Sequence, residues 1–134
     1  MIQYSHRIRV RYAECDRMGF VHHSVYALYF EEARTEALRA MGIVYKDLED
    51  SGVIMPLRNL YLDFKRAARY DDLLRIESRI PEMPKVRCGV TYEVFNQDNE
   101  LICTGSTELF FVDKHSLKPR GISEDLKEKF QKHF

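Results

Sequence analysis

The sequence contains no tryptophan and only three cysteines, Cys15, Cys88 and Cys103. The cysteines are scattered and no two form a Cys-x-x-Cys pair, so neither a zinc knuckle nor a thioredoxin-like redox pair is indicated. We expect Cys88 and Cys103 to be small, reduced packing residues. The role of Cys15 stays open at this point, because it stands beside residues that could be chemically active.

Net charge is absent too, since 21 Lys and Arg residues balance 21 Asp and Glu residues. This balance argues against a nucleic-acid-binding protein that works through a strong overall field, although it leaves room for a local basic patch. No apolar stretch approaches the roughly 20 residues that span a bilayer. Residues 1–7 lack the apolar core of a signal peptide. We therefore expect a cytoplasmic protein with no nucleic-acid partner and no membrane span.

The 134 residues fit one domain, which we expect to span 1–134. Hydrophobic residues make up 45% and charged residues 31% of the chain, as in a globular protein with a core. The sequence contains no low-complexity tract, linker or internal repeat. Changes in the hydrophobic period therefore carry most of the structural information.

The first half of the chain predicts one strand and one long helix. Residues 4–12 alternate, with Tyr4 to Tyr12 on one face and arginines on the other, as in a half-buried strand. From Ser24 the apolar positions step by three or four, which indicates a helix of about five turns. Ser24 is its expected N-cap and Gly42 its expected end. The apolar stripe of this helix is Tyr26, Phe30, Ala33, Ala37 and Met41.

The second half predicts four strands, at 57–66, 73–80, 86–94 and 100–112, with a hairpin turn at 96–99. A short polar helix over 123–133 closes the chain. The four strands resemble an antiparallel meander. We therefore predict an α+β fold in which an antiparallel sheet of about five strands wraps around the long helix.

One helix covers only one face of such a sheet, so the opposite face needs another cover. We expect a partner subunit to supply it and predict a homo-oligomer, a tetramer built from two dimers. The residues expected to compete for this face are Tyr61, Leu101, Leu109 and Phe111.

The segment 12–26 is the richest in chemistry and joins a strand end to a helix start, where functional residues tend to gather. Asp16 has two interpretations of about equal weight. It either caps a turn through its carboxylate, or it faces the helix N-terminus as a catalytic carboxylate. We expect Glu14 to pair with an arginine of the first strand.

His22 and His23 do not make a convincing metal site, because adjacent side chains diverge and no third ligand is evident. The chain also lacks the Gly-x-Ser-x-Gly elbow of serine hydrolases and the glycine motifs of nucleotide sites. Basic residues cluster in three places, and most of them are expected to be solvated. One or two could contact the phosphates of an anionic ligand. The clusters are Lys65, Arg66 and Arg69; Lys85 and Arg87; and Lys114, Lys118 and Arg120.

The run 11–26, followed by 29–34, resembles the signature of the hotdog-fold acyl-CoA thioesterases. It is most similar to the 4-hydroxybenzoyl-CoA thioesterase group and its YbgC-like branch. The resemblance extends to 64–72, 112–113 and 118–120, so it covers nearly the whole chain. It implies a sheet wrapped around a central helix, dimers joined through a continuous sheet and often tetramers. It also implies hydrolysis of acyl-CoA thioesters with no metal and no organic cofactor.

By this resemblance, the catalytic residues are Asp16 and His23, and the backbone amide near His23 polarises the thioester carbonyl. Asp16 acts either as a general base or as a nucleophile. The substrate is an acyl-CoA or an acyl carrier protein thioester, whose acyl group the sequence does not reveal. The substrate-binding residues are expected to be Gly19, Val21, His22, Ser24, Tyr26, Lys65, Arg66 and Arg69.

Two other functions stay open at the level of sequence. A hotdog hydratase or dehydratase would use a histidine and an acidic partner for proton transfer at carbon. A non-catalytic module would bind acyl thioesters or an acyl carrier protein without releasing a thiol.

Overall fold

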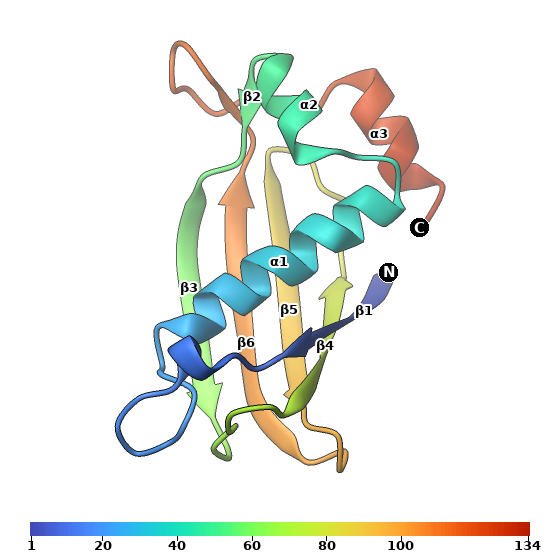
Figure 1. The fold of residues 1–134 in the computed structure, drawn as a ribbon. Helices are drawn as coiled ribbons and strands as arrows, with labels where there is room; N and C mark the ends of the chain where they lie inside the picture. The colour runs from blue at the N-terminus through green and yellow to red at the C-terminus, as the bar shows by residue number, and fades with distance from the viewer.

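The computed structural model describes all residues, 1–134, and consists of one long helix packed across an antiparallel sheet (Figure 1). The helix is α1, Val25–Ala40. The sheet has the strand order β1-β4-β5-β6-β3, and all neighbouring strands are antiparallel. The predicted α+β architecture of about five strands around a helix is confirmed. The strands are β1 (Ile2–Arg9), β3 (Leu57–Phe64), β4 (Leu73–Ile80), β5 (Arg87–Phe95) and β6 (Leu101–Phe110).

The order of the strands differs from a simple meander. Strands β4, β5 and β6 follow one another as predicted, but β3 does not pair with β4. It pairs instead with β6, at the far edge of the sheet from β1. The prediction of a four-strand meander was therefore wrong for β3. As a result, β3 is an edge strand with one side unpaired.

The apolar stripe of α1 forms the centre of the core. All five predicted positions of this stripe are buried. The Phe30 ring stacks on Tyr92 of β5 with centroids 4.1 Å apart. A Cβ atom on Gly105 of β6 would lie 2.5 Å from the Phe30 ring, so only glycine allows this close packing of helix on sheet. The helix ends as predicted at Gly42, whose φ of +80° suits glycine.

Smaller elements gather at the end of the molecule where α1 ends (Figure 1). They were not all predicted: α2, Tyr45–Asp50, and a two-stranded sheet of β2 and β7 occupy positions expected to be connections or strand ends. The predicted C-terminal helix is present as α3, Glu124–Gln131. The two short strands are β2 (Val53–Ile54) and β7 (Val112–Asp113). No helix in the protein is long and apolar enough to cross a membrane.

The outer face of the sheet is more polar than expected. Leu109 and Phe111 are buried in the core, so the prediction that they occupy the outer face was wrong. Only Tyr61 of that group is strongly exposed, at 61%. The outward Phe110 of β6 lies beneath two arginines, Arg58 and Arg87, which both pair with Glu108.

The first strand is shorter than predicted. It alternates as expected between half-buried and exposed side chains, but it ends at Arg9. Tyr12 was expected on its buried face and is instead 80% exposed. The reason is a change of backbone: residues Tyr12–Glu14 form a 3₁₀ turn, η1, which ends the alternation of faces. This turn opens the loop that leads to α1.

Candidate active site

The loop between β1 and α1 folds back on itself as a small hairpin-like turn. Cys15 and Val21 form an isolated antiparallel bridge, which brings the two ends of the loop together. Within it, the Gly19 N–H donates to the Asp16 carbonyl at 3.0 Å. Gly19 has a φ of +83°, a conformation that favours glycine. The turn from Asp16 to Gly19, expected from the sequence, is therefore confirmed.

The Asp16 carboxylate uses only one oxygen to hold this turn. Its Oδ1 accepts hydrogen bonds from the backbone N–H groups of Met18, at 2.9 Å, and Phe20, at 3.2 Å. The second oxygen accepts no hydrogen bond from the protein. The two interpretations of Asp16 are therefore compatible, since one oxygen caps the turn while the other is free for chemistry.

Asp16 borders a cavity of about 350 Å³ between this loop, the first turn of α1 and the end of β3. His23 and Tyr26 border the same cavity, so the structure brings Asp16 and His23 together. The buried Tyr26 ring meets the Phe64 ring edge to face, with centroids 5.3 Å apart. Burial raises the pKa of the Tyr26 hydroxyl, so this group stays protonated at neutral pH. The full lining is Asp16, Met18, Phe20, Val21, His23, Tyr26, Phe64, Lys65, Arg66 and Ala67.

The backbone N–H of His23 is free at the start of α1. It donates no hydrogen bond to any group of the protein, whereas the next two N–H groups are both used. Ser24 donates to His22 Nδ1 at 3.2 Å, and Val25 donates to the His22 carbonyl at 3.0 Å. A free N–H at a helix N-terminus is suited to an oxygen that carries partial negative charge.

His22 and Ser24 bond to each other and line neither this cavity nor the neighbouring one. Ser24 occupies the predicted N-cap position, but its side chain caps no helix N–H. Its Oγ lies 2.7 Å from His22 Nδ1 instead. The Ser24 N–H also donates to Nδ1 at 3.2 Å, so both contacts from Ser24 converge on this nitrogen. The His22 ring packs against His23, with centroids 4.1 Å apart.

Glu14 anchors the loop to the helix. Its carboxylate accepts hydrogen bonds from the Arg11 N–H at 2.8 Å and from the Tyr29 hydroxyl at 2.9 Å. It also pairs with the Arg11 guanidinium at 3.1 Å, as the sequence predicted. Burial raises the pKa of Glu14, but these hydrogen bonds and the Arg11 charge outweigh burial, so the net pKa lies below its ordinary value.

Cys15, left open by the sequence, is not an activated thiol. Burial raises its pKa, and the neighbouring carboxylates of Asp16 and Glu14 raise it further. A thiol with a raised pKa carries little thiolate and is a weak nucleophile. Cys88 and Cys103 are buried and unpaired, in agreement with their predicted packing role.

The three basic residues predicted to bind substrate differ in whether a carboxylate of the protein already neutralises their charge. Lys65 pairs with Asp63 at 2.8 Å, and Arg66 pairs with Glu100 at 3.3 Å, both at the rim of the cavity. Arg69 lies outside the cavity, with its guanidinium 4.9 Å from the centre of the Phe20 ring. Arg69 forms no ion pair, so of the three residues it is the one whose charge is free to attract an anionic ligand.

A second cavity of about 430 Å³ lies on the other side of Asp16. It includes Gly19, which was predicted to bind substrate, and Arg17, which was not and which forms no ion pair. This second cavity is lined by Tyr12, Cys15, Asp16, Arg17, Gly19 and Tyr70.

The sequence interpretation also missed the side chains of the first cavity that come from the end of β3. Phe64 is part of the motif 64–72 and could have been found there as the last apolar residue of its strand.

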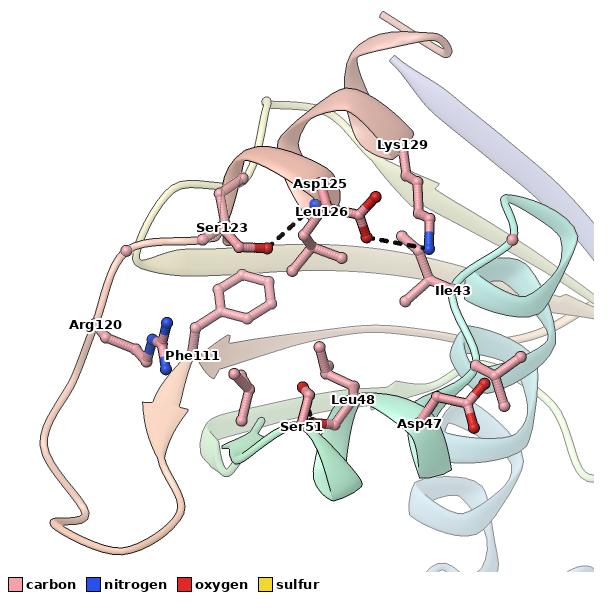
Figure 2. A pocket seen from close by; sticks show the side chains of 15 residues that line it. Ile43, Asp47, Leu48, Ser51, Phe111, Arg120, Ser123, Asp125, Leu126 and Lys129 are labelled. Carbon is pink, nitrogen blue, oxygen red and sulfur yellow. Dashed lines mark hydrogen bonds and ion pairs between the residues drawn. The ribbon is translucent and has the colours of Figure 1, made fainter.

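A further cavity of about 340 Å³ lies at the opposite end of α1, between α2 and α3 (Figure 2). Its basic side chains already face carboxylates: Lys129 lies 3.4 Å from Asp125, and Arg120 lies 3.9 Å from Asp113. No group of three or more His, Cys, Asp or Glu side chains is placed to hold a metal ion anywhere in the protein.

Comparisons with known proteins place the chain in a family. A family model described as the thioesterase-like superfamily matches residues 10–130. The chain belongs to this superfamily. It is 31% identical over 112 residues to the putative acyl-CoA thioesterase YneP of Bacillus subtilis (strain 168), covering 84% of this chain and 81% of that protein. It is 30% identical over 129 residues to the acyl-CoA thioesterase YbgC of Haemophilus influenzae, covering 95% and 93%.

A solved structure supports the same assignment. The DHNA-CoA thioesterase from Staphylococcus aureus superposes on this chain with a TM-score of 0.93 at 33% identity, covering 98% of this chain and 91% of the other. The predicted hotdog fold and the predicted thioesterase family are therefore confirmed. The protein is a thioester hydrolase.

Proposed function

We propose that this protein hydrolyses acyl-CoA thioesters to a free acid and CoA, with Asp16 and the start of α1 as its active site. The observation that carries the proposal is the pairing of two free groups on one cavity. Asp16 and His23 both line this cavity, and each has a free group: a carboxylate oxygen of Asp16 and the unpaired backbone N–H of His23. The acyl-CoA names of YneP and YbgC support CoA as the thiol.

The chemistry follows from these two groups. The His23 N–H donates to the thioester oxygen and stabilises the negative charge that develops there, helped by the positive end of the α1 dipole. As a general base, Asp16 takes a proton from water, the hydroxide adds to the acyl carbon, and the C–S bond breaks. As a nucleophile, it forms an anhydride that water then cleaves. In both routes the thiolate leaves and the proton from water returns to it.

The remaining predicted residues have supporting roles in this proposal. Val21 and Tyr26 pack against the thioester, and the His23 side chain orients water or the Asp16 carboxylate. His22 and Ser24, bonded to each other, hold the helix start in place. Lys65, Arg66 and Arg69, with Gly19 and Arg17 beside Asp16, bind the CoA phosphates and the adjoining chain. An acyl carrier protein presents the same phosphopantetheine thioester and is a second donor to test. The cytoplasmic location remains a prediction.

We also propose that the protein forms a homodimer through β3. This edge strand has an unpaired side and carries four exposed apolar residues, Leu57, Leu60, Tyr61 and Phe64. Pairing two copies of β3 would satisfy the free backbone groups and continue the sheet. The homotetramer predicted from the sequence would join two such dimers.

The decisive experiment measures thiol release from short, long and aromatic acyl-CoA substrates. We expect Asp16→Asn to lower kcat by about 10²–10⁴-fold, because the amide still caps the turn but is no base or nucleophile at neutral pH. Asp113→Asn is the matched control, since Asp113 also accepts two backbone N–H groups in a turn, from His115 and Ser116, and lines neither cavity beside Asp16. It should keep normal turnover.

Three results would contradict the proposal. Near-normal turnover of Asp16→Asn would make Asp16 a turn residue only. Binding of acyl-CoA without thiol release would indicate a binding module. Loss or gain of the conjugated absorbance of an enoyl-CoA, without thiol release, would indicate a hydratase or dehydratase.

A further inference from the structure

Tyr26 is a buried tyrosine in the first turn of α1, and its hydroxyl donates to no group of the protein. The residue is 2% exposed and lines the cavity that Asp16 and His23 also border. Polar groups buried to this degree are almost always hydrogen-bonded. Because the protein offers no acceptor for the hydroxyl hydrogen, the acceptor has to come from the molecule that fills the cavity.

The other two buried tyrosines differ from Tyr26 in this respect. The Tyr29 hydroxyl donates to Glu14 at 2.9 Å, and the Tyr92 hydroxyl lies 2.8 Å from the hydroxyl of Thr107. Each of these two hydroxyls therefore has a side-chain oxygen within hydrogen-bond distance. Of the three buried tyrosines, only Tyr26 keeps a hydrogen that is free for a bound molecule.

The oxygen of the Tyr26 hydroxyl is held by the backbone of Ala68. Burial is the main cause that raises the pKa of this hydroxyl, and the hydrogen bond from the Ala68 backbone opposes it. Ala68 is itself fully buried, and its carbonyl accepts from the Val21 N–H at 2.8 Å, so its position is fixed. A phenol oxygen that accepts from an N–H has a more polarised O–H, which is then a stronger donor. Tyr26 therefore presents a protonated and fixed hydrogen-bond donor.

Tyr26 follows His23 by three positions at the start of α1. The helical turn already begins at His22, whose carbonyl accepts from the Val25 N–H at 3.0 Å. Side chains of an α-helix lean toward its N-terminus and cover the preceding turn. The Tyr26 side chain therefore leans toward the turn that carries the free His23 N–H. The cavity is thus bordered by two residues that each have a free donor.

The thioester carbonyl oxygen is the substrate atom that best matches two donors. It becomes an oxyanion when water or Asp16 adds to the acyl carbon, and an oxyanion accepts more than one strong hydrogen bond. The sulfur atom is a weak acceptor by comparison. Asp16 does not use the Tyr26 hydroxyl either, since its own hydrogen bonds come from Met18 and Phe20.

We propose that Tyr26 is a further catalytic residue, whose hydroxyl donates a hydrogen bond to the thioester carbonyl oxygen together with the His23 N–H. This inference rests on the proposed function. Tyr26 transfers no proton: the phenol keeps its hydrogen throughout, and Asp16 acts as base or nucleophile as described. Because the hydrogen bond strengthens as charge develops on the oxygen, it lowers the barrier more than it tightens substrate binding.

The first test compares two variants that each lose one tyrosine hydroxyl. We expect Tyr26→Phe to lower kcat by about 10²–10³-fold with little change in KM. Tyr45→Phe is the matched control: the Tyr45 oxygen also accepts from a backbone N–H, that of Met55 at 3.2 Å, but its hydroxyl lies 3.5 Å from the Met55 carbonyl and the residue lines neither cavity beside Asp16. Both variants leave one backbone N–H without its acceptor, so they should unfold at similar urea concentrations. Only Tyr45→Phe should keep normal kcat.

The second test measures the hydrogen bond by infrared spectroscopy. The probe is hexanoyl-CoA or benzoyl-CoA, whichever the wild type cleaves faster, labelled with ¹³C at the carbonyl and bound to Asp16→Asn. Adding Tyr26→Phe should raise the carbonyl stretching frequency, and adding Tyr45→Phe should leave it unchanged. Tyr26→3-fluorotyrosine, a more acidic phenol that keeps the contact with Ala68, should lower the frequency. This last variant retains both hydrogen-bonding groups, so it decides the question even if Tyr26→Phe does not fold.

Three results would overturn the inference. They are a kcat of Tyr26→Phe no lower than that of Tyr45→Phe, a loss of kcat/KM in Tyr26→Phe that comes from KM alone, and a carbonyl frequency that does not respond to 3-fluorotyrosine at position 26. These results leave the proposed function intact, since that fails only if the wild type releases no thiol or Asp16→Asn stays active.

Discussion

The Tyr29 hydroxyl lies 2.9 Å from Glu14 Oε1 and donates a hydrogen bond to it. Tyr29 belongs to the second turn of α1 and is almost fully buried, whereas Glu14 belongs to the turn that precedes Asp16. The Glu14 carbonyl in turn accepts from the His22 N–H at 2.9 Å. Glu14 therefore connects the loop that carries Asp16 with α1, which His23 immediately precedes at the same cavity.

Tyr29→Phe should loosen this connection without emptying the core, because only the hydroxyl is removed. We expect the free energy of unfolding to fall by about 1–2 kcal/mol and kcat to fall more than tenfold, since Asp16 loses its fixed position. Ser123→Ala is a control of similar cost, about 1 kcal/mol, because it removes the N-cap bond of α3 far from Asp16. If both variants lose the same fraction of turnover, Tyr29 acts on stability alone.

Lowering the pH should weaken the hydrogen bonds by which the Glu14 carboxylate holds the loop to α1. The pKa of Glu14 in the folded protein lies below its ordinary value of 4.5, so Glu14 stabilises the fold above pH 4.5 and loses this effect as the pH falls through the folded pKa. Glu14→Gln should therefore be less stable than wild type at neutral pH, and the difference should shrink below pH 4.5. Urea unfolding at several pH values measures it. A constant difference across that range would contradict the assignment.

Chelation should leave activity unchanged, since Asp16 and the His23 N–H supply the proposed chemistry directly. The measurement is thiol release after exhaustive dialysis against a chelator, with and without added divalent metal. Lost activity that returns only with metal would show that Asp16 is not the direct agent.

The oligomer should have two or four times the chain mass of 15.9 kDa by light scattering at micromolar concentration. Leu60→Lys places a charge on the exposed edge strand β3 and should shift the protein toward a monomer. Leu117→Lys is the matched control, because Leu117 is exposed at 67% in a loop beyond β7. A wild-type particle of monomer mass would contradict both the dimer and the tetramer.

Local pattern was sufficient for much of the fold and part of the site. The alternation over 73–80 coincides with β4, and the helical stripe of α1 is buried at every predicted position. The Asp16 to Gly19 turn was readable too, because aspartate at the first position and glycine at the fourth favour such a turn through local forces. The even positions of β6, with Thr104, Ser106 and Glu108, already carried the signal that Leu109 faces the core.

The sequence by itself determined the elements, their buried faces and the run 11–26 that marks the family, because each depends on neighbours within a few residues. Tertiary structure alone decided that β3 pairs with β6, since strand partners are chosen by packing between distant segments. It also decided that Asp16 and His23 border one cavity with Phe64 of β3, because these residues come from segments that are distant in the sequence.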